Sequence, residues 1–220
     1  MMTSSHKQKS SRTTSPRKRL VLRRREEAIL EAALALFGGS GWQAVTVDAI
    51  AARAEVAKGT VYLHFASKDE LYARLALDFE RETLDRLREI DPGLGALDRL
   101  RAAVGAYWAR TRASRTRRRL TRYCAREDFR RTLLPATREA LARLDAEIAG
   151  WFEEVIRTGI AQGVLPSRPV EVLLFTLLSA LDGAVDRAWG RGEVEDPEAH
   201  RRLLTTFILA GITYGGKALT

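Results

Sequence analysis

Apolar residues recur at intervals of three and four along this chain from Arg23 almost to its end, and this spacing constrains the fold more than any other feature. Such spacing places apolar side chains on one face of an α-helix. Clusters rich in Gly and Pro interrupt it, and no alternating apolar run is long enough for a β-strand. The pattern therefore predicts an all-α fold, with helices at 23–37, 46–53, 58–65, 67–87, 94–112, 116–131, 135–162, 167–189 and 197–217.

The excess of basic residues lies in the N-terminal segment. The formal net charge is +9, and nine Lys and Arg residues precede Glu26 with no acidic residue among them, so the rest of the chain is neutral overall. Residues 1–22 combine six of these charges with many Ser and Thr residues and no aromatic residue, a composition too polar to bury a core. We therefore predict a disordered basic arm at 1–22, to which the inference of a nucleic-acid or anionic partner applies.

Cysteine and hydropathy patterns limit the compartment and the cofactors. Cys124 is the single cysteine, which excludes an intramolecular disulfide and a cysteine-rich zinc site and indicates a reducing compartment. The longest apolar stretch, 172–181, is much shorter than the ~20 residues of a membrane span. No apolar segment of signal-peptide length follows the basic N-terminus. We expect a cytoplasmic protein with no membrane partner, no cofactor and no metal.

Two short helices with a tight turn between them indicate a helix-turn-helix at 46–65. Thr46 is a good N-cap for the first. In the second, Val61 and Phe65 are expected to face inward, and the polar residues Lys58, Thr60, Tyr62 and His64 outward. The sequence Ser67-Lys68-Asp69-Glu70 predicts a capping box, in which Ser67 accepts a backbone N–H bond and Glu70 reaches back, at the start of a long helix.

The segment Ala28–Leu77 resembles the N-terminal domain of the tetracycline-repressor (TetR) family. The residues that carry the resemblance are Ala32-Ala33-Leu34-Ala35-Leu36-Phe37, Gly41, Thr46, Ile50-Ala51, Ala54 to Phe65, and Ser67-Lys68-Asp69-Glu70-Leu71. The resemblance implies an all-α homodimer that binds palindromic double-stranded DNA. It implies an N-terminal three-helix helix-turn-helix domain at 23–82 and a C-terminal helical ligand-binding and dimerisation domain at 83–220.

The same resemblance supplies a set of DNA contacts. In the family's pattern, the residues that meet phosphates correspond to Thr46, Tyr62, His64 and Lys68, and those that face bases correspond to Lys58, Gly59 and Thr60. The chain departs from that pattern at Glu55, where glycine is usual in the turn, and at Ala57, where serine usually caps the recognition helix. We expect Glu55 to adopt the left-handed backbone conformation that non-glycine residues disfavour.

Beyond residue 91 the sequence predicts architecture more readily than chemistry. Aromatic residues are candidates for an effector pocket or for plain core: Tyr107, Trp108, Tyr123, Phe129, Trp151, Phe152 and Phe175. The last two helices are candidates for a four-helix dimer seam, or again for core: Leu174, Leu178, Leu181, Leu204, Phe207, Ile208 and Gly211.

Two further features allow more than one interpretation. Ten arginines lie between Arg110 and Arg131, and they indicate an anionic effector, added attraction for DNA, or a surface paired with acidic residues elsewhere. Cys124 lies among these arginines, so its thiol is a candidate oxidant sensor or an inert core residue.

The favoured function is a transcriptional regulator, most often a repressor, that a small-molecule effector of unknown identity releases from its operator. A DNA-binding protein without an effector is the main alternative. A helical enzyme has little support, because His6, His64 and His200 lie far apart in the sequence and no phosphate-binding glycine loop or nucleophile motif is present.

Overall fold

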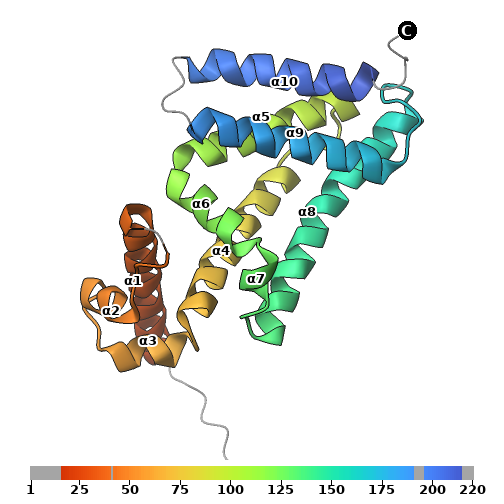
Figure 1. Ribbon diagram of the computed structural model, residues 1–220. Helices are drawn as coiled ribbons and strands as arrows, with labels where there is room; N and C mark the ends of the chain where they lie inside the picture. The colour runs from red at the N-terminus through yellow and green to blue at the C-terminus, as the bar shows by residue number, and fades with distance from the viewer. Residues whose placement is uncertain (1–15, 41, 191–195, 215–220) are drawn as a thin grey trace, which may run out of the picture. The chain divides into compact units, whose positions relative to one another are not determined.

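The computed structural model describes residues 16–40, 42–190 and 196–214, and the elements within these ranges are all α-helices, as predicted (Figure 1). The helices are α1 (Pro16–Ser40), α2 (Val47–Arg53), α3 (Lys58–His64), α4 (Lys68–Arg88), α5 (Ala96–Ala113), α6 (Arg115–Cys124), α7 (Glu127–Arg130), α8 (Pro135–Ala161), α9 (Val170–Gly190) and α10 (Pro197–Tyr214).

The chain divides by contacts into two compact units, residues 1–66 and residues 67–220. Helix α4 belongs to the second unit because it packs on α8 and α6. The domain boundary expected after residue 82 would therefore divide α4.

The first unit is a three-helix domain in which α1, α2 and α3 pack on one another. Its core consists of buried apolar side chains from all three helices, among them Ile29, Phe37, Ile50 and Val61. Helix α2 begins as predicted, because the Thr46 Oγ1 atom accepts a hydrogen bond of 3.1 Å from the Ala49 N–H. Helix α1 begins at Pro16, so residues 16–22, which we assigned to the arm, are helical, and the arm before them lies outside the described residues.

The turn between α2 and α3 depends on a left-handed residue. Glu55 has φ = 54°. The Val56 N–H donates to the Ala51 carbonyl at 3.0 Å, which is the bond that closes a helix through a residue in this conformation. The expectation for Glu55 is confirmed, and the backbone here carries the strain that glycine avoids.

Replacing Glu55 with glycine should therefore stabilise the protein by about 1 kcal/mol, because glycine adopts this conformation without the clash of a Cβ atom. Chemical denaturation followed by circular dichroism measures the difference in the free energy of unfolding. Glu55→Ala is the matched control, since it removes the charge and keeps the Cβ atom. Equal stability of the two variants would show that charge, and not backbone strain, is the cost at this position.

The second unit consists of the helices α4 to α10. Figure 1 shows α9 and α10 side by side, with α5 behind them. The core of this unit is formed by apolar residues of α5, α8, α9 and α10, including Trp108, Ile156, Leu177 and Ile208. The single helix expected at 116–131 is instead two helices, α6 and α7, because the backbone of Arg126 is extended. No Gly or Pro marks this break, which accompanies burial of Phe129.

The start of α4 is only half as predicted. The Ser67 Oγ atom accepts a hydrogen bond from the Glu70 N–H at 3.1 Å, which confirms the cap. The prediction that the Glu70 carboxylate reaches back to the start of its own helix is wrong. Its oxygens accept from the Leu134 N–H at 2.7 Å and from the Thr137 hydroxyl at 2.6 Å. Leu134 is the N-cap of α8 and offers no capping side chain, so Glu70 supplies a negative charge to that helix terminus.

Across the ranges that the structure describes, none of the helices is both long and apolar enough to cross a bilayer.

Candidate nucleic-acid interface and internal cavity

Helix α3 has one buried side and one exposed side. Val61 is buried in α3, as is Phe65 at its C-cap, which fixes the helix to the first unit. Lys58 and Gly59 are exposed, Thr60 is half-buried and Tyr62 is 50% exposed. The N-cap, Ala57, makes no side-chain hydrogen bond, so the missing cap that the sequence indicated is confirmed.

The structure corrects the outward side of α3. The side chain of His64 is only 10% exposed, and its Nδ1 atom lies 4.0 Å from a carboxylate oxygen of Glu26 on α1. His64 follows Val61 by three residues and therefore lies on the same side of the helix. The residue that points most fully outward is Leu63, at 85% exposed, which sequence reasoning missed.

Lys58 is held by an acidic residue of the neighbouring helix. Its Nζ atom lies 2.9 Å from an oxygen of Asp48 in the first turn of α2. The hydrogen bond and the charge of Asp48 raise the pKa of Lys58. We predict from the sequence that Lys58 faces bases, and a base edge would then compete with Asp48 for this ammonium group.

We expect Asp48→Asn to strengthen DNA binding by about 3- to 10-fold at low salt, since it frees Lys58 and removes a negative charge from the interface. Fluorescence anisotropy with labelled duplex DNA over a range of salt concentrations measures the effect. Glu27→Gln on α1 is a control for the loss of an acidic group elsewhere in the unit. Weaker binding by Asp48→Asn would mean that Asp48 positions Lys58 instead of competing for it.

The remaining predicted contacts lie at helix starts. Thr46 is exposed at the N-cap of α2, where its side chain already accepts the Ala49 N–H. Lys68 is the first residue of α4 and is half-buried. It belongs to the second unit, whereas the other six predicted DNA contacts belong to the first.

The second unit contains a cavity of about 300 Å³. Its wall combines apolar side chains with charged and hydroxyl groups. The residues that form it come from α4, α5, α6, α8 and α9 and include Glu80, Thr83, Arg86, Leu87, Ala103, Ala106, Tyr107, Arg110, Arg118, Thr121, Arg122, Asp145, Ile148, Ala149, Phe152, Leu178, Leu181 and Asp182. Its volume lies at the lower end of the range for small-molecule sites.

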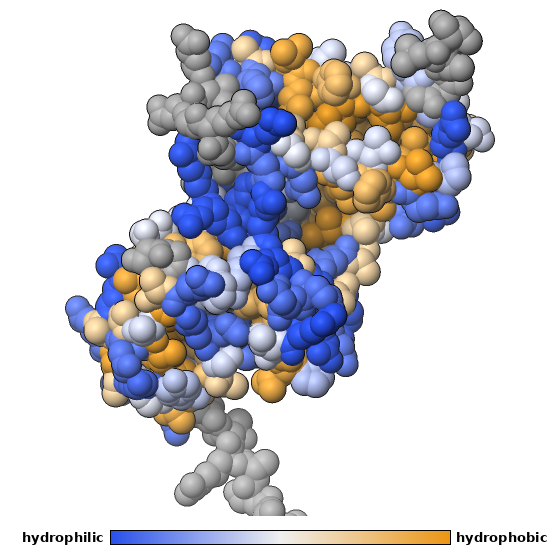
Figure 2. Space-filling view, viewed as in Figure 1, coloured by the Kyte–Doolittle hydropathy of each residue, from blue (hydrophilic) through white to orange (hydrophobic). Residues whose placement is uncertain are grey.

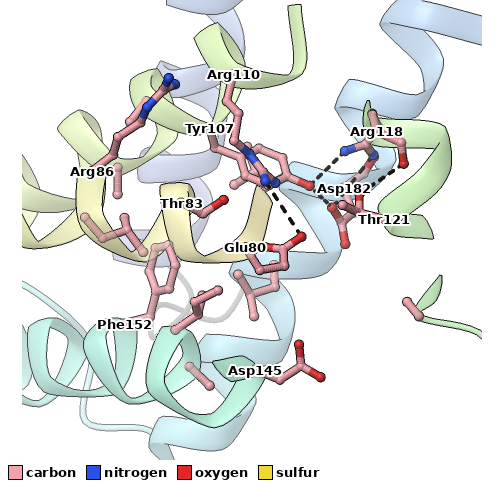
Figure 3. Close-up of a pocket in the computed structure, with 18 of the residues that line it drawn as sticks. Glu80, Thr83, Arg86, Tyr107, Arg110, Arg118, Thr121, Asp145, Phe152 and Asp182 are labelled. Atoms are coloured by element: carbon pink, nitrogen blue, oxygen red, sulfur yellow. Dashed lines mark hydrogen bonds and ion pairs between the residues drawn. The ribbon is translucent and has the colours of Figure 1, made fainter. Parts of the chain in front are cut away.

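Figure 3 shows Arg110, Arg118, Asp182 and Glu80 around Tyr107. The Tyr107 hydroxyl donates to Asp182 and accepts from the Arg118 Nη1 atom at 2.8 Å. Burial, followed by the charge of Asp182, raises the pKa of Tyr107 to about 12. The guanidinium of Arg110 lies 3.7 Å from the carboxylate of Glu80, and burial raises the pKa of that carboxyl group although Arg110 opposes the shift.

Comparison with known proteins places the first unit in a family. Residues 29–75 match the family model described as bacterial regulatory proteins, tetR family. The chain belongs to the TetR family. It is thus a helix-turn-helix DNA-binding transcriptional regulator and not an enzyme.

Similarity to individual TetR regulators differs in identity and in extent. The HTH-type transcriptional regulator YhgD of Bacillus subtilis is 25% identical over 190 residues, which span 86% of this chain and 97% of YhgD. The transcriptional repressor KstR of Rhodococcus jostii is 43% identical, but over 77 residues that span 34% of this chain and 35% of KstR. The crystal structure of FadR from Bacillus subtilis in complex with stearoyl-CoA has the same fold, with a TM-score of 0.71 at 19% identity, over 84% of this chain and 98% of FadR.

The predicted aromatic pocket residues of this TetR regulator are dispersed. Tyr107 and Phe152 line the cavity. Trp108 is in the core, Trp151 packs edge to face on Phe152, and Phe175 is 74% exposed on α9. Tyr123 and Phe129 pack on each other, with ring centroids 4.8 Å apart. Sequence reasoning missed Glu80 and Thr83, although they share the helical spacing of the apolar residue Leu87 on α4.

The predicted seam residues on α9 and α10 divide between core and surface. Leu181 and Ile208 are buried in the core, and Leu174, Leu178 and Leu204 are half-buried against it. Phe207, at 73% exposed, and Gly211 face outward. Phe207 is one of several exposed large apolar or aromatic residues of the two helices, the others being Val172, Phe175, Leu203 and Tyr214. Figure 2 shows apolar residues in orange where α9 and α10 lie in Figure 1.

Seven of the ten arginines in the cluster form ion pairs with acidic residues, in agreement with one of the three interpretations. Ion pairs join Arg110 to Glu80, Arg117 to Glu82, Arg118 and Arg122 to Asp186, Arg126 to Asp128, Arg130 to Asp145, and Arg131 to Glu127.

Cys124 is buried, and burial raises the pKa of its thiol. A protonated, inaccessible thiol reacts slowly with oxidants, so the structure favours the inert core role.

Proposed function

We propose that this TetR regulator is a repressor that binds a palindromic operator as a homodimer and leaves it when a small-molecule effector enters the cavity of the second unit. The observation that carries this proposal is that α4 lines the cavity and begins only four residues after the end of α3. Displacement of α4 by a ligand therefore acts on the helix that leads directly into the recognition helix.

The connection between α4 and α8 supplies a mechanism. The first turn of α4 is bound to the start of α8 and to the segment before it, through Glu70 to Leu134 and Thr137 and through Asp69 to the Thr132 hydroxyl at 2.8 Å. Both α4 and α8 line the cavity at their middles, through Thr83 and Phe152 among others. A ligand that separates the two helices would strain these bonds and change the angle of α4, and with it the spacing of two recognition helices in a dimer.

Dimerisation is supported by the exposed apolar surface of α9 and α10 and by the DNA geometry. One recognition helix of seven residues reads few base pairs, whereas two placed about one DNA turn apart, ~34 Å, read a palindrome. KstR, which is 43% identical over 77 residues, is a repressor, and FadR, which shares the fold, binds stearoyl-CoA. Both facts favour a ligand-controlled repressor.

Filling the cavity tests the proposal. Operator DNA is first selected from random duplexes with the wild-type protein and footprinted upstream of its own gene. A compound library is then screened for release of that DNA. Ala149→Phe places a ring into the cavity from α8, and Ala142→Phe, on the exposed side of the same helix, is the control.

The two variants should differ in response and not in DNA binding itself. We expect the Ala149→Phe variant to bind the operator and to ignore the effector, and the Ala142→Phe variant to respond as the wild type does. A selected operator with no compound that releases it would favour the alternative of a DNA-binding protein without an effector. Absence of sequence-selective binding would overturn the proposal.

A further inference from the structure

Most polar groups at the cavity wall already have partners. The Tyr107 hydroxyl both donates and accepts a hydrogen bond. The Arg118 guanidinium donates to Tyr107, to the Asp182 backbone carbonyl and to the Asp186 carboxylate. These groups form a closed network, and a ligand gains little by contacting it because each new bond would replace an existing one.

Arg110 and Glu80 differ from this network because their pairing is incomplete. The side chains are only 14% and 20% exposed, and the 3.7 Å between Nη1 and the carboxylate oxygen is too long for a good hydrogen bond. The Arg110 Nη1 atom donates instead to the Phe79 carbonyl, at 3.2 Å. The Arg110 Nε atom is buried without a hydrogen-bond partner among the described residues. Arg110 thus carries a buried donor without a hydrogen-bond partner beside the Glu80 carboxylate.

We infer that the effector is a small, uncharged molecule with an apolar body and one head group that both accepts and donates a hydrogen bond, such as a carboxamide. This inference rests on the proposed function and specifies the ligand of the same site. The head group's oxygen accepts from the Arg110 guanidinium and its N–H donates to the Glu80 carboxylate. The apolar body lies against Leu87, Ile148 and Phe152.

Charge balance favours the uncharged head group over an ion. Arg110 and Glu80 neutralise each other, so an anionic or cationic head group placed between these two side chains would bring an uncompensated charge out of water. A hydrocarbon without a head group would leave the Arg110 donor unpaired. A coenzyme A thioester, the class bound by FadR, carries several phosphate groups and is too large for about 300 Å³.

A matched series of single-ring probes tests this inference on the free protein. Benzamide, benzoate, benzylamine and toluene share the ring and differ in the head group. Their affinities are measured by nuclear magnetic resonance titration at neutral pH. We expect benzamide to bind at least tenfold more tightly than each of the other three. Equal or tighter binding of benzoate, benzylamine or toluene would overturn the inference, as would no binding of any probe.

Replacing each of two cavity arginines with lysine tests where the head group binds. Arg110→Lys keeps the charge opposite Glu80 and removes the Nε donor, so benzamide affinity should fall about tenfold while toluene affinity is unchanged. Arg86→Lys, also at the cavity wall, should alter neither. Because these measurements contain no DNA, they are separate from the proposed function: benzamide selectivity without any ligand-induced release of DNA would contradict the repressor mechanism alone.

Leu63 carries a second and independent inference, which also rests on the proposed function. It is exposed to 85%, the largest value among the large apolar residues that the structure describes, and it follows the half-exposed Tyr62 on α3. Exposing a leucine to water is unfavourable, and the only apolar group on base edges in the major groove is the methyl group of thymine. We propose that Leu63 contacts a thymine methyl group and selects thymine at one position of each half-site.

Removal of that methyl group tests the second inference directly. Deoxyuridine replaces thymine, one position at a time, in the selected operator, because it pairs identically and lacks only the methyl group. Wild-type affinity should fall about 3- to 10-fold at one position, and Leu63→Ala should bind the two duplexes equally.

Leu94→Ala, which truncates an exposed leucine of the second unit, is the control and should retain the wild-type preference. Operator binding with no methyl preference that depends on Leu63 would overturn this inference and leave the repressor intact. Absence of any selected operator would overturn both.

Discussion

Replacing Gly59 with leucine is expected to weaken operator binding by about 100-fold while stabilising the free protein slightly. A Cβ atom at Gly59 would meet nothing within 4 Å, so the fold accepts a side chain there. Leucine in place of a helical glycine contributes up to about 1 kcal/mol of stability. At the DNA, by contrast, the side chain would occupy the space of a base edge, and a loss of about 2.7 kcal/mol corresponds to 100-fold.

The opposite signs of these two effects make the Gly59→Leu experiment decisive. Thermal unfolding measures stability, and fluorescence anisotropy with the selected operator measures affinity. Gly150→Leu is the matched control, since Gly150 is an exposed glycine of helix α8 whose Cβ position is also open. It should gain similar stability and keep full affinity. If Gly59→Leu also keeps full affinity, the N-terminal end of α3 does not approach the DNA.

The sequence was sufficient to predict the helices of the first unit and several of their ends, because local rules determine them. The Thr46 cap and the left-handed conformation of Glu55 depend on neighbours within a few residues. The outward side of α3 was predicted less well, because the polar residues were taken to face outward whatever their position. With Val61 and Phe65 inward, a repeat of 3.6 residues per turn places His64 near the core and Leu63 outward.

The cavity could not be predicted from the sequence, because its wall combines residues from five helices. Aromatic residues were poor indicators, since Trp108 is needed in the core and Phe175 is left on the surface. The Glu70 carboxylate is similar: local rules favour a bond to its own helix, whereas the N–H of Leu134, 64 positions away in the sequence, takes it instead. Such choices depend on tertiary packing, which spacing within one helix does not encode.

Phe207→Arg is expected to convert the regulator to monomers and to reduce operator affinity at least 100-fold. Phe207 is exposed to 73% in the protomer, so arginine at this position leaves the core intact. In a two-fold symmetric interface one substitution acts twice. Loss of two buried phenylalanines amounts to about 3 to 6 kcal/mol before the repulsion of the added charges is included. Analytical ultracentrifugation measures the oligomeric state, and anisotropy measures the affinity.

Two further substitutions separate loss of the dimer from loss of the fold. Leu94→Arg changes an exposed leucine outside α9 and α10 and should leave a dimer that binds the operator. Ile208→Arg adjoins Phe207 but enters the buried core, so it should unfold the protein. A folded Phe207→Arg variant that stays dimeric would place the interface elsewhere. A monomer that keeps full affinity would show that a single recognition helix is enough, and the palindrome would lose its physical basis.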